Sequence, residues 1–131
     1  KEDGLEEKIM HYLELNQISD YFFLDQPFPT LKASLDMKLE SAIRISEFEN
    51  LKSVPSFRKT PNFVWMDSFF RFNILNYDFE EIKNLNLKVC LVSPELQGRN
   101  YDEIIHIKES FTSINYRPWG VCTKRPELWV D

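Results

Sequence analysis

Short apolar runs alternate with helix-like segments along the whole chain, and this alternation limits the folds open to it more than any other feature. Residues 4–17 show the helical pattern, because Leu5, Ile9 and Leu13 recur four residues apart. Five apolar runs of strand length are found, near residues 21–25, 42–46, 63–67, 87–92 and 119–123. Strands that alternate with helices predict an α/β fold.

The strand-like runs are almost continuously apolar, and they do not alternate between apolar and polar residues. This pattern is typical of parallel sheets that are covered on both faces. The clearest run is LKVCLV (87–92), which lies between Asn-Leu-Asn and Ser-Pro. A length of 131 residues fits one domain. We therefore expect residues 1–131 to form a single domain of parallel β/α units.

Two architectures satisfy this pattern. One is an open, doubly wound, flavodoxin-like sheet of five strands, which suits a chain of this length. The other is five-eighths of a TIM-type (β/α) barrel, whose complete form needs about 250 residues. The periodicity alone leaves both open.

Composition excludes several classes of function. The net charge is −5 without a basic stripe, which argues against nucleic-acid binding. No apolar run approaches the roughly 18 residues needed to span a membrane. Cys90 and Cys122 lie in apolar runs and are expected to be free, buried thiols. Because residues 1–8 are mostly charged and give no secretory signal, we expect a cytoplasmic protein.

Six stretches carry a family resemblance, and KVCLVSPEL and CTKRPELW are its most specific parts. The stretches are KEDGL (1–5), YFFLDQPFP (21–29), AIRISEFE (42–49), FVWMDSF (63–69), KVCLVSPELQGR (88–99) and GVCTKRPELW (120–129). In order and spacing they resemble the later half of glycerophosphodiester phosphodiesterase-like barrels, in the phospholipase-C-like phosphodiesterase superfamily. The resemblance implies the C-terminal five-eighths of a TIM-type barrel, from a family that hydrolyses phosphodiesters with a divalent metal.

The family's catalytic half is missing from this sequence. The resemblance implies a His-Arg-Gly near the first strand, acidic metal ligands on the next strands and a second histidine. The only histidines here are His11 and His106, which lie in helical segments and are not followed by Arg-Gly. We therefore expect a fragment that holds no cofactor and is inactive alone, because phosphodiester cleavage needs charge neutralisation and proton transfer.

Two other functions remain open at this point. One is a non-catalytic half-barrel that binds a ligand or another subunit. The other is a flavodoxin-like receiver with Asp67 as its phosphoacceptor. That function calls for an acidic pair after the first strand, where only Asp25 stands, and a late lysine, which Lys124 matches loosely.

Candidate site residues lie at the carboxyl ends of the strands, where parallel β/α folds place their function. Arg44 lies inside an apolar run and needs either a phosphate or an acidic partner such as Asp25 or Asp67. Arg99 and Lys124 would suit an anionic phosphate group. For each carboxylate the structural alternative is a loop cap or an ion pair. The ligand-binding candidates are Asp25, Arg44, Asp67, Glu95, Arg99 and Lys124, with Glu47, Trp65 and Thr123 at the same strand ends.

Partial barrels leave two sheet edges unpaired and one apolar face uncovered. Such edges pair readily with other chains. We therefore expect a homo-oligomer, most simply a dimer whose interface buries barrel-interior residues.

Overall fold

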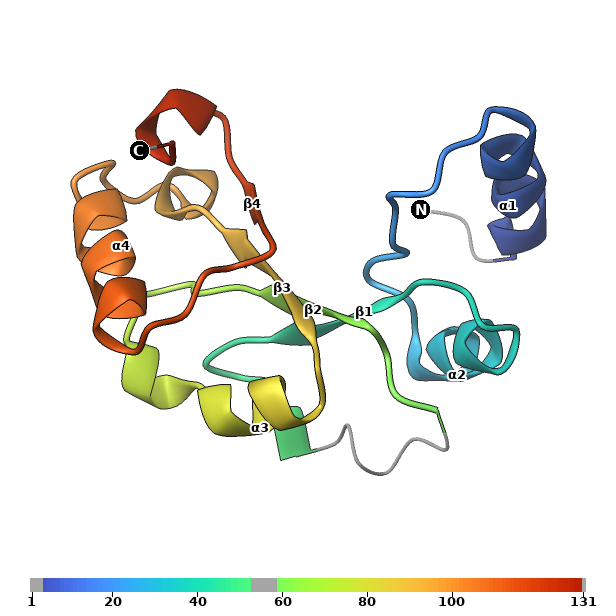
Figure 1. Cartoon of the computed structure of the whole chain (residues 1–131), viewed down its shortest axis with the longest axis horizontal. Coiled ribbons are helices and arrows are strands. Elements are labelled where there is room, and N and C mark those ends of the chain that lie inside the picture. The colour runs from blue at the N-terminus through green and yellow to red at the C-terminus, as the bar shows by residue number, and fades with distance from the viewer. Residues whose placement is uncertain (1–3, 53–58, 131) are drawn as a thin grey trace.

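A computed structural model describes residues 4–52 and 59–130. Its centre is a sheet of four strands that are hydrogen-bonded to one another in chain order (Figure 1). All three strand pairs are parallel, which confirms the prediction of parallel β/α units. The strands are β1 (Ala42–Ile45), β2 (Phe63–Met66), β3 (Lys88–Val92) and β4 (Gly120–Cys122).

The strand order bears on one of the two predicted architectures, the flavodoxin-like sheet. A flavodoxin-like sheet reverses its strand order at a switch point. The described strands run β1-β2-β3-β4 without a reversal, so the sheet is open but is not doubly wound in that manner.

Residues 21–25 make one bridge to the sheet in place of the expected fifth strand. Phe23 pairs in parallel with Ser41, and its N–H donates to the Glu40 carbonyl at 2.8 Å. The pairing stops there because Asp25 has a left-handed backbone (φ 56°) and Pro27 has no N–H to donate. The apolar pattern YFFLD therefore predicted the direction of this segment but overestimated its length.

Four α-helices are found in the described residues, and the third has a side-chain cap at its amino end. The Asp78 side chain caps α3 by accepting the Glu81 N–H at 3.0 Å. No helix in residues 4–52 or 59–130 is long and apolar enough to cross a membrane. The helices are α1 (Glu6–Leu15), α2 (Phe28–Asp36), α3 (Phe79–Asn84) and α4 (Glu103–Ser113).

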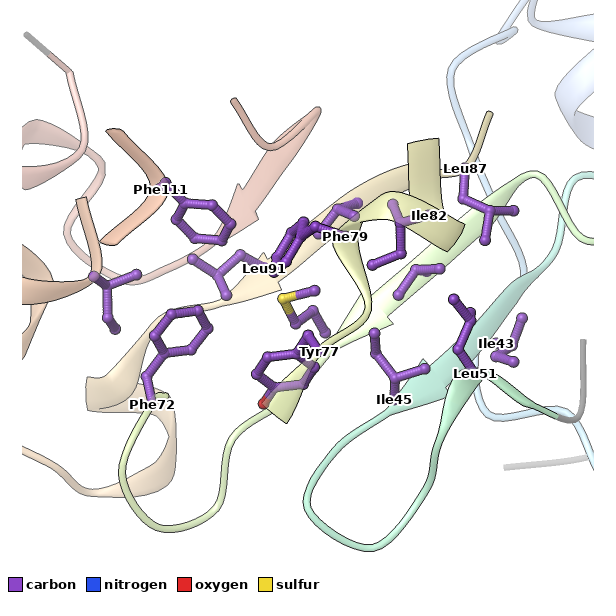
Figure 2. Close-up of a cluster of buried hydrophobic side chains, with 14 residues drawn as sticks. Ile43, Ile45, Leu51, Phe72, Tyr77, Phe79, Ile82, Leu87, Leu91 and Phe111 are labelled. Carbon is purple, nitrogen blue, oxygen red and sulfur yellow. The ribbon is translucent and has the colours of Figure 1, made fainter. Parts of the chain in front are cut away.

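One face of the sheet forms the hydrophobic core (Figure 2). Alternate strand residues such as Val64 and Val89 point to this face and are fully buried. They pack against Ile82 of α3 and Phe111 of α4. The core therefore fixes α3 and α4 to the sheet, whereas α1 has no buried residue.

The other alternate strand residues point to the opposite face, and the middle part of that face is what we call the inner face: Arg44, Trp65, Cys90, Gly120 and Cys122. The first four occupy one row across the sheet, because they are partners in the strand register. Cys90 is buried, but the other residues are only half-buried. A Cβ added at Gly120 would meet no atom within 4 Å. Ala42, Phe63 and Val92 also point to the face opposite the core and are buried, so within the described residues this face is covered in part.

Candidate functional site at the carboxyl ends of the strands

An acidic residue follows each of the first three strands and the bridged segment before them. We call these four residues the strand-end carboxylates: Asp25, Glu47, Asp67 and Glu95. Because all strands are parallel, the four lie along one edge of the sheet. Each of them binds the strand that comes next in the chain, or the loop after that strand. We call each such set of contacts a joint.

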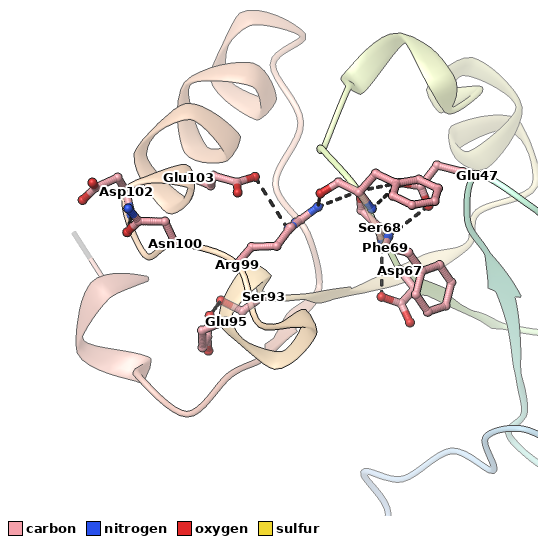
Figure 3. A network of polar contacts seen from close by, with 11 residues as sticks. Glu47, Asp67, Ser68, Phe69, Ser93, Glu95, Arg99, Asn100, Asp102 and Glu103 are labelled. Atoms are coloured by element: carbon pink, nitrogen blue, oxygen red, sulfur yellow. Dashed lines mark hydrogen bonds and ion pairs between the residues drawn. The ribbon is translucent and has the colours of Figure 1, made fainter.

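Glu47 follows β1 and holds the loop after β2 (Figure 3). Its carboxylate accepts hydrogen bonds from the Ser68 hydroxyl at 3.0 Å and from the N–H groups of Phe69 at 3.0 Å and Phe70 at 3.2 Å. Partial burial acts to raise the pKa of Glu47, but these donors outweigh it and the pKa is lowered. Glu47 is therefore an ionised anchor for the loop.

Asp67 follows β2 and reaches the loop after β3. Its carboxylate accepts from the Gln97 amide at 2.8 Å and from the N–H of Ser68 at 2.9 Å. The Tyr77 hydroxyl donates to the Asp67 carbonyl at 2.8 Å, and burial raises the pKa of Tyr77 to about 12. Asp67 is only 5% exposed, so its carboxylate is committed to these contacts.

Glu95 follows β3 and holds the loop after β4. It accepts from the Thr123 hydroxyl at 2.5 Å, from the Lys124 N–H at 3.0 Å and from the Ser93 hydroxyl. Burial acts to raise the pKa of Glu95, but these donors lower it overall. The Trp129 indole N–H also donates to Ser93 at 3.0 Å, which ties the C-terminal segment to the same joint.

Arg44 and Asp25 form an ion pair, so Arg44 meets one of the three partners that the sequence left open for it, namely a phosphate, Asp25 or Asp67. Their side chains are 32% and 40% exposed, so the pair is not buried. It lines a cavity of about 770 Å³ beside β1, which the exposed rings of Phe28 and Phe48 also border.

Arg99 joins the loops after β2 and β3 in a second way (Figure 3). Its guanidinium donates to the Ser68 hydroxyl at 3.3 Å and to the Phe70 carbonyl, and it lies 3.6 Å from the Glu103 carboxylate. Lys124 contacts Glu95 through its backbone N–H, and its side chain is exposed. The two cations therefore bind different groups, although the sequence suggested that both could hold one phosphate.

The strand-end carboxylates at this edge are hydrogen-bonded or ion-paired to the neighbouring strand or loop. A general acid needs a carboxyl group whose pKa is raised, whereas the pKa values of Glu47 and Glu95 are lowered. Across residues 4–52 and 59–130, no group of three or more His, Cys, Asp or Glu side chains is arranged to hold a metal ion. The described edge organises loops and leaves no free acid–base pair among Glu47, Asp67 and Glu95.

Both cysteines are free, as the sequence predicted, although only Cys90 is fully buried. Burial raises the pKa of Cys90 to about 11. Burial, together with the nearby Glu95 and Asp67, also raises the pKa of Cys122. Neither thiol is therefore activated as a nucleophile.

Searches against protein-family models, curated proteins and solved structures find no match to this chain.

Sequence reasoning did not identify Ser68 and Gln97, whose side chains complete the joints of Glu47 and Asp67. Both residues lie just after strands, and that position is the only signal in the sequence that could have suggested them.

Proposed function

We propose that this chain forms the later part of a phosphodiesterase-like (β/α) barrel and has no hydrolytic activity of its own. The observation that carries the proposal is the row of strand-end carboxylates along one edge of a parallel sheet whose strands are paired in chain order. Barrels of this type place their substrates at that edge. The ordered sequence stretches from KEDGL to KRPELW supply the family in this proposal.

We propose that hydrolytic activity is absent because the carboxylates at the strand ends are ionised and already hydrogen-bonded, and because the histidines lie elsewhere. Glu47 and Glu95 are ionised and already accept several hydrogen bonds each. The two histidines are exposed on helices, His11 on α1 and His106 on α4. Proton transfer and the binding of a metal ion would therefore need side chains other than these.

Hydrolysis of bis-p-nitrophenyl phosphate by the purified chain tests the proposal, with Mg²⁺, Ca²⁺ or Mn²⁺ added in turn. We expect no release of p-nitrophenolate above the metal-only control. An Asp67→Asn variant is the matched control, because it changes the most deeply buried of the strand-end carboxylates. Turnover that the wild type shows and this variant loses would overturn the proposal.

A second candidate function is supported by the incomplete cover of the inner face. A half-barrel that binds another subunit would use this surface, because half-covered sheet faces and unpaired strand edges are association sites. β4 is the last strand in the pairing order of the described sheet, and Trp119 beside it is 48% exposed. Sedimentation of the wild-type chain over a range of concentrations tests this function, and a mass that stays at 15.7 kDa throughout would contradict self-association.

A further inference from the structure

We propose that a cavity beside β4 binds a small aromatic anion, that is, a planar ring that carries a carboxylate or a phosphate group. We call it the β4 cavity. It lies between the last turn of α4, β4 and Trp129, and its volume is about 520 Å³. Cavities of about 300–1,000 Å³ are of the size that takes small molecules. The inference goes beyond both functions proposed above and does not depend on the phosphodiesterase resemblance.

The charge of its lining distinguishes the β4 cavity from others in the molecule. Lys108 and Arg117 line it, and none of the described residues that line it is an aspartate or a glutamate. Four other cavities in the described part of the chain each include at least one of these acids. The whole chain has a net charge of −5, so a hollow with cations and no carboxylate runs against its overall charge. Such a lining favours an anionic ligand.

Arg117 is the residue that we expect to hold the anionic group. Its side chain is exposed, and within residues 4–52 and 59–130 it forms no ion pair. Glu109 follows Lys108 on α4 but lines a separate cavity. The carbonyl end of α4 carries partial negative charge, which is reduced here because the Phe111 carbonyl accepts the Tyr116 N–H at 3.1 Å. A guanidinium binds a carboxylate or a phosphate through two parallel hydrogen bonds.

The backbone of β4 adds a hydrogen-bond donor. The Cys122 carbonyl accepts the Ser93 N–H at 2.9 Å, so the backbone groups of Cys122 face β3. In a parallel pair of strands the next residue faces the other way, so the N–H of Val121 points to the outer edge of the described sheet. Val121 lines the β4 cavity. An anion at this edge can therefore accept a backbone hydrogen bond as well.

Aromatic side chains provide a surface for the ring of the ligand. Tyr116 and Trp129 are half-buried and line the cavity. The indole N–H of Trp129 donates to the Ser93 hydroxyl at 3.0 Å, and the Tyr116 ring lies 4.9 Å from that of Phe79, so both rings are held in place. Aromatic pairs gain free energy beyond the area that they bury. A planar ring therefore suits this cavity better than an aliphatic chain.

NMR titration of the ¹⁵N-labelled chain tests the site. The probes are 2-naphthoate, an aromatic carboxylate, and adenosine monophosphate, an aromatic phosphate. We expect saturable shifts in the amides of residues 115–121 and in the Trp129 indole N–H. A probe of about a dozen non-hydrogen atoms with ordinary ligand efficiency has a Kd of about 1 mM. The probe with the lower Kd identifies which anionic group the site prefers.

Replacing Arg117 with glutamine separates the effect of charge from that of shape. We expect Arg117→Gln to raise the Kd of 2-naphthoate about tenfold and to change that of the uncharged 2-naphthamide less than about twofold. Arg71→Gln is the matched control, because Arg71 is also exposed but lines a different cavity. Circular dichroism checks that both variants keep the wild-type fold. Should Arg117→Gln fail to fold, salt decides the test on the wild type: about 0.5 M NaCl should weaken 2-naphthoate at least about threefold and leave 2-naphthamide unchanged.

Two results would overturn the inference. One is the absence of saturable shifts in residues 115–121 and Trp129 with either anion up to about 10 mM. The other is equal weakening of 2-naphthoate and 2-naphthamide by Arg117→Gln, since the arginine would then contribute shape and not charge. Neither result bears on the hydrolysis assay or on sedimentation, so this inference and the proposed functions fail separately.

Discussion

Replacing Glu47 with glutamine tests whether the strand-end carboxylates hold the loops in place. The Glu47 carboxylate accepts three hydrogen bonds, from the Ser68 hydroxyl and from the N–H groups of Phe69 and Phe70. A glutamine side chain of the same shape has one oxygen only, and its NH₂ group must face at least one of these donors. A buried donor without an acceptor costs about 1–3 kcal/mol, and bonds to a charged acceptor are the stronger ones. Because Glu47 is half-buried, we expect a loss of about 2 kcal/mol in the free energy of unfolding.

Urea unfolding followed by tryptophan fluorescence measures this loss. For a urea m-value of about 2 kcal/mol per molar, a loss of 2 kcal/mol lowers the midpoint by about 1 M. Glu80→Gln is the matched control, since Glu80 is 83% exposed and forms an ion pair with Lys83. The control is expected to change stability by less than about 0.5 kcal/mol. If the two variants unfold at the same urea concentration, Glu47 is not an anchor.

The pH dependence gives an independent check. The pKa of Glu47 is lowered in the folded chain, so its stabilisation is fully present above the unfolded pKa of about 4.3. The stabilisation is lost as the pH falls through the folded pKa. The difference between wild type and Glu47→Gln is therefore expected to be constant from pH 7 to pH 5 and to shrink below about pH 4. A difference that persists unchanged at low pH would show that the carboxylate's charge is not its source.

Three further predictions follow from the core, the last strand joint and the thiols. Ile82→Ala removes a side chain with 0% exposure and is expected to cost about 2–5 kcal/mol in urea unfolding, and a loss below about 1 kcal/mol would contradict the assigned packing. Glu95→Ala deprives the Thr123 hydroxyl and the Lys124 N–H of their acceptor and should speed amide exchange in β4 about tenfold, read by mass spectrometry, whereas unchanged exchange would argue against the joint. Iodoacetamide at pH 8 should label Cys122 before Cys90, because a pKa of about 11 leaves about one Cys90 thiol in a thousand ionised, and the reverse order would refute this environment.

The strands of the sheet could be predicted from the sequence because their signal is local. The runs at 42–46, 63–67, 87–92 and 119–123 match β1 to β4 within one residue at each end. Residues 21–25 have an equally apolar pattern but pair only at Phe23, because the backbone conformation after that residue turns the chain away. The apolar pattern therefore identified the strands of the sheet, whereas the left-handed backbone at Asp25 ended the pairing of the first apolar run.

The site could be predicted only in part, because its contacts are long-range. The position of Asp67 at a strand end marked it as a candidate, but its partner Gln97 is 30 residues further along the chain. Whether Arg44 meets Asp25 or Asp67 was likewise undecided by the sequence, and it depends on how the bridged segment lies beside β1. Strand-end position therefore predicts which residues meet at an edge, while loop geometry decides which of them pair.

The strand-end carboxylates have a consequence for how this edge opens. Each carboxylate binds the strand or loop of the next β/α unit. Every loop between the first and the last therefore carries a carboxylate that binds the next loop and is itself bound by the carboxylate before it. Such a series of nearest-neighbour contacts resembles a repeat protein, in which the stability of each unit depends on its contacts with the adjacent units. The edge should therefore fray from its two ends, and an insertion in a middle loop would break two joints where an insertion at either end breaks one.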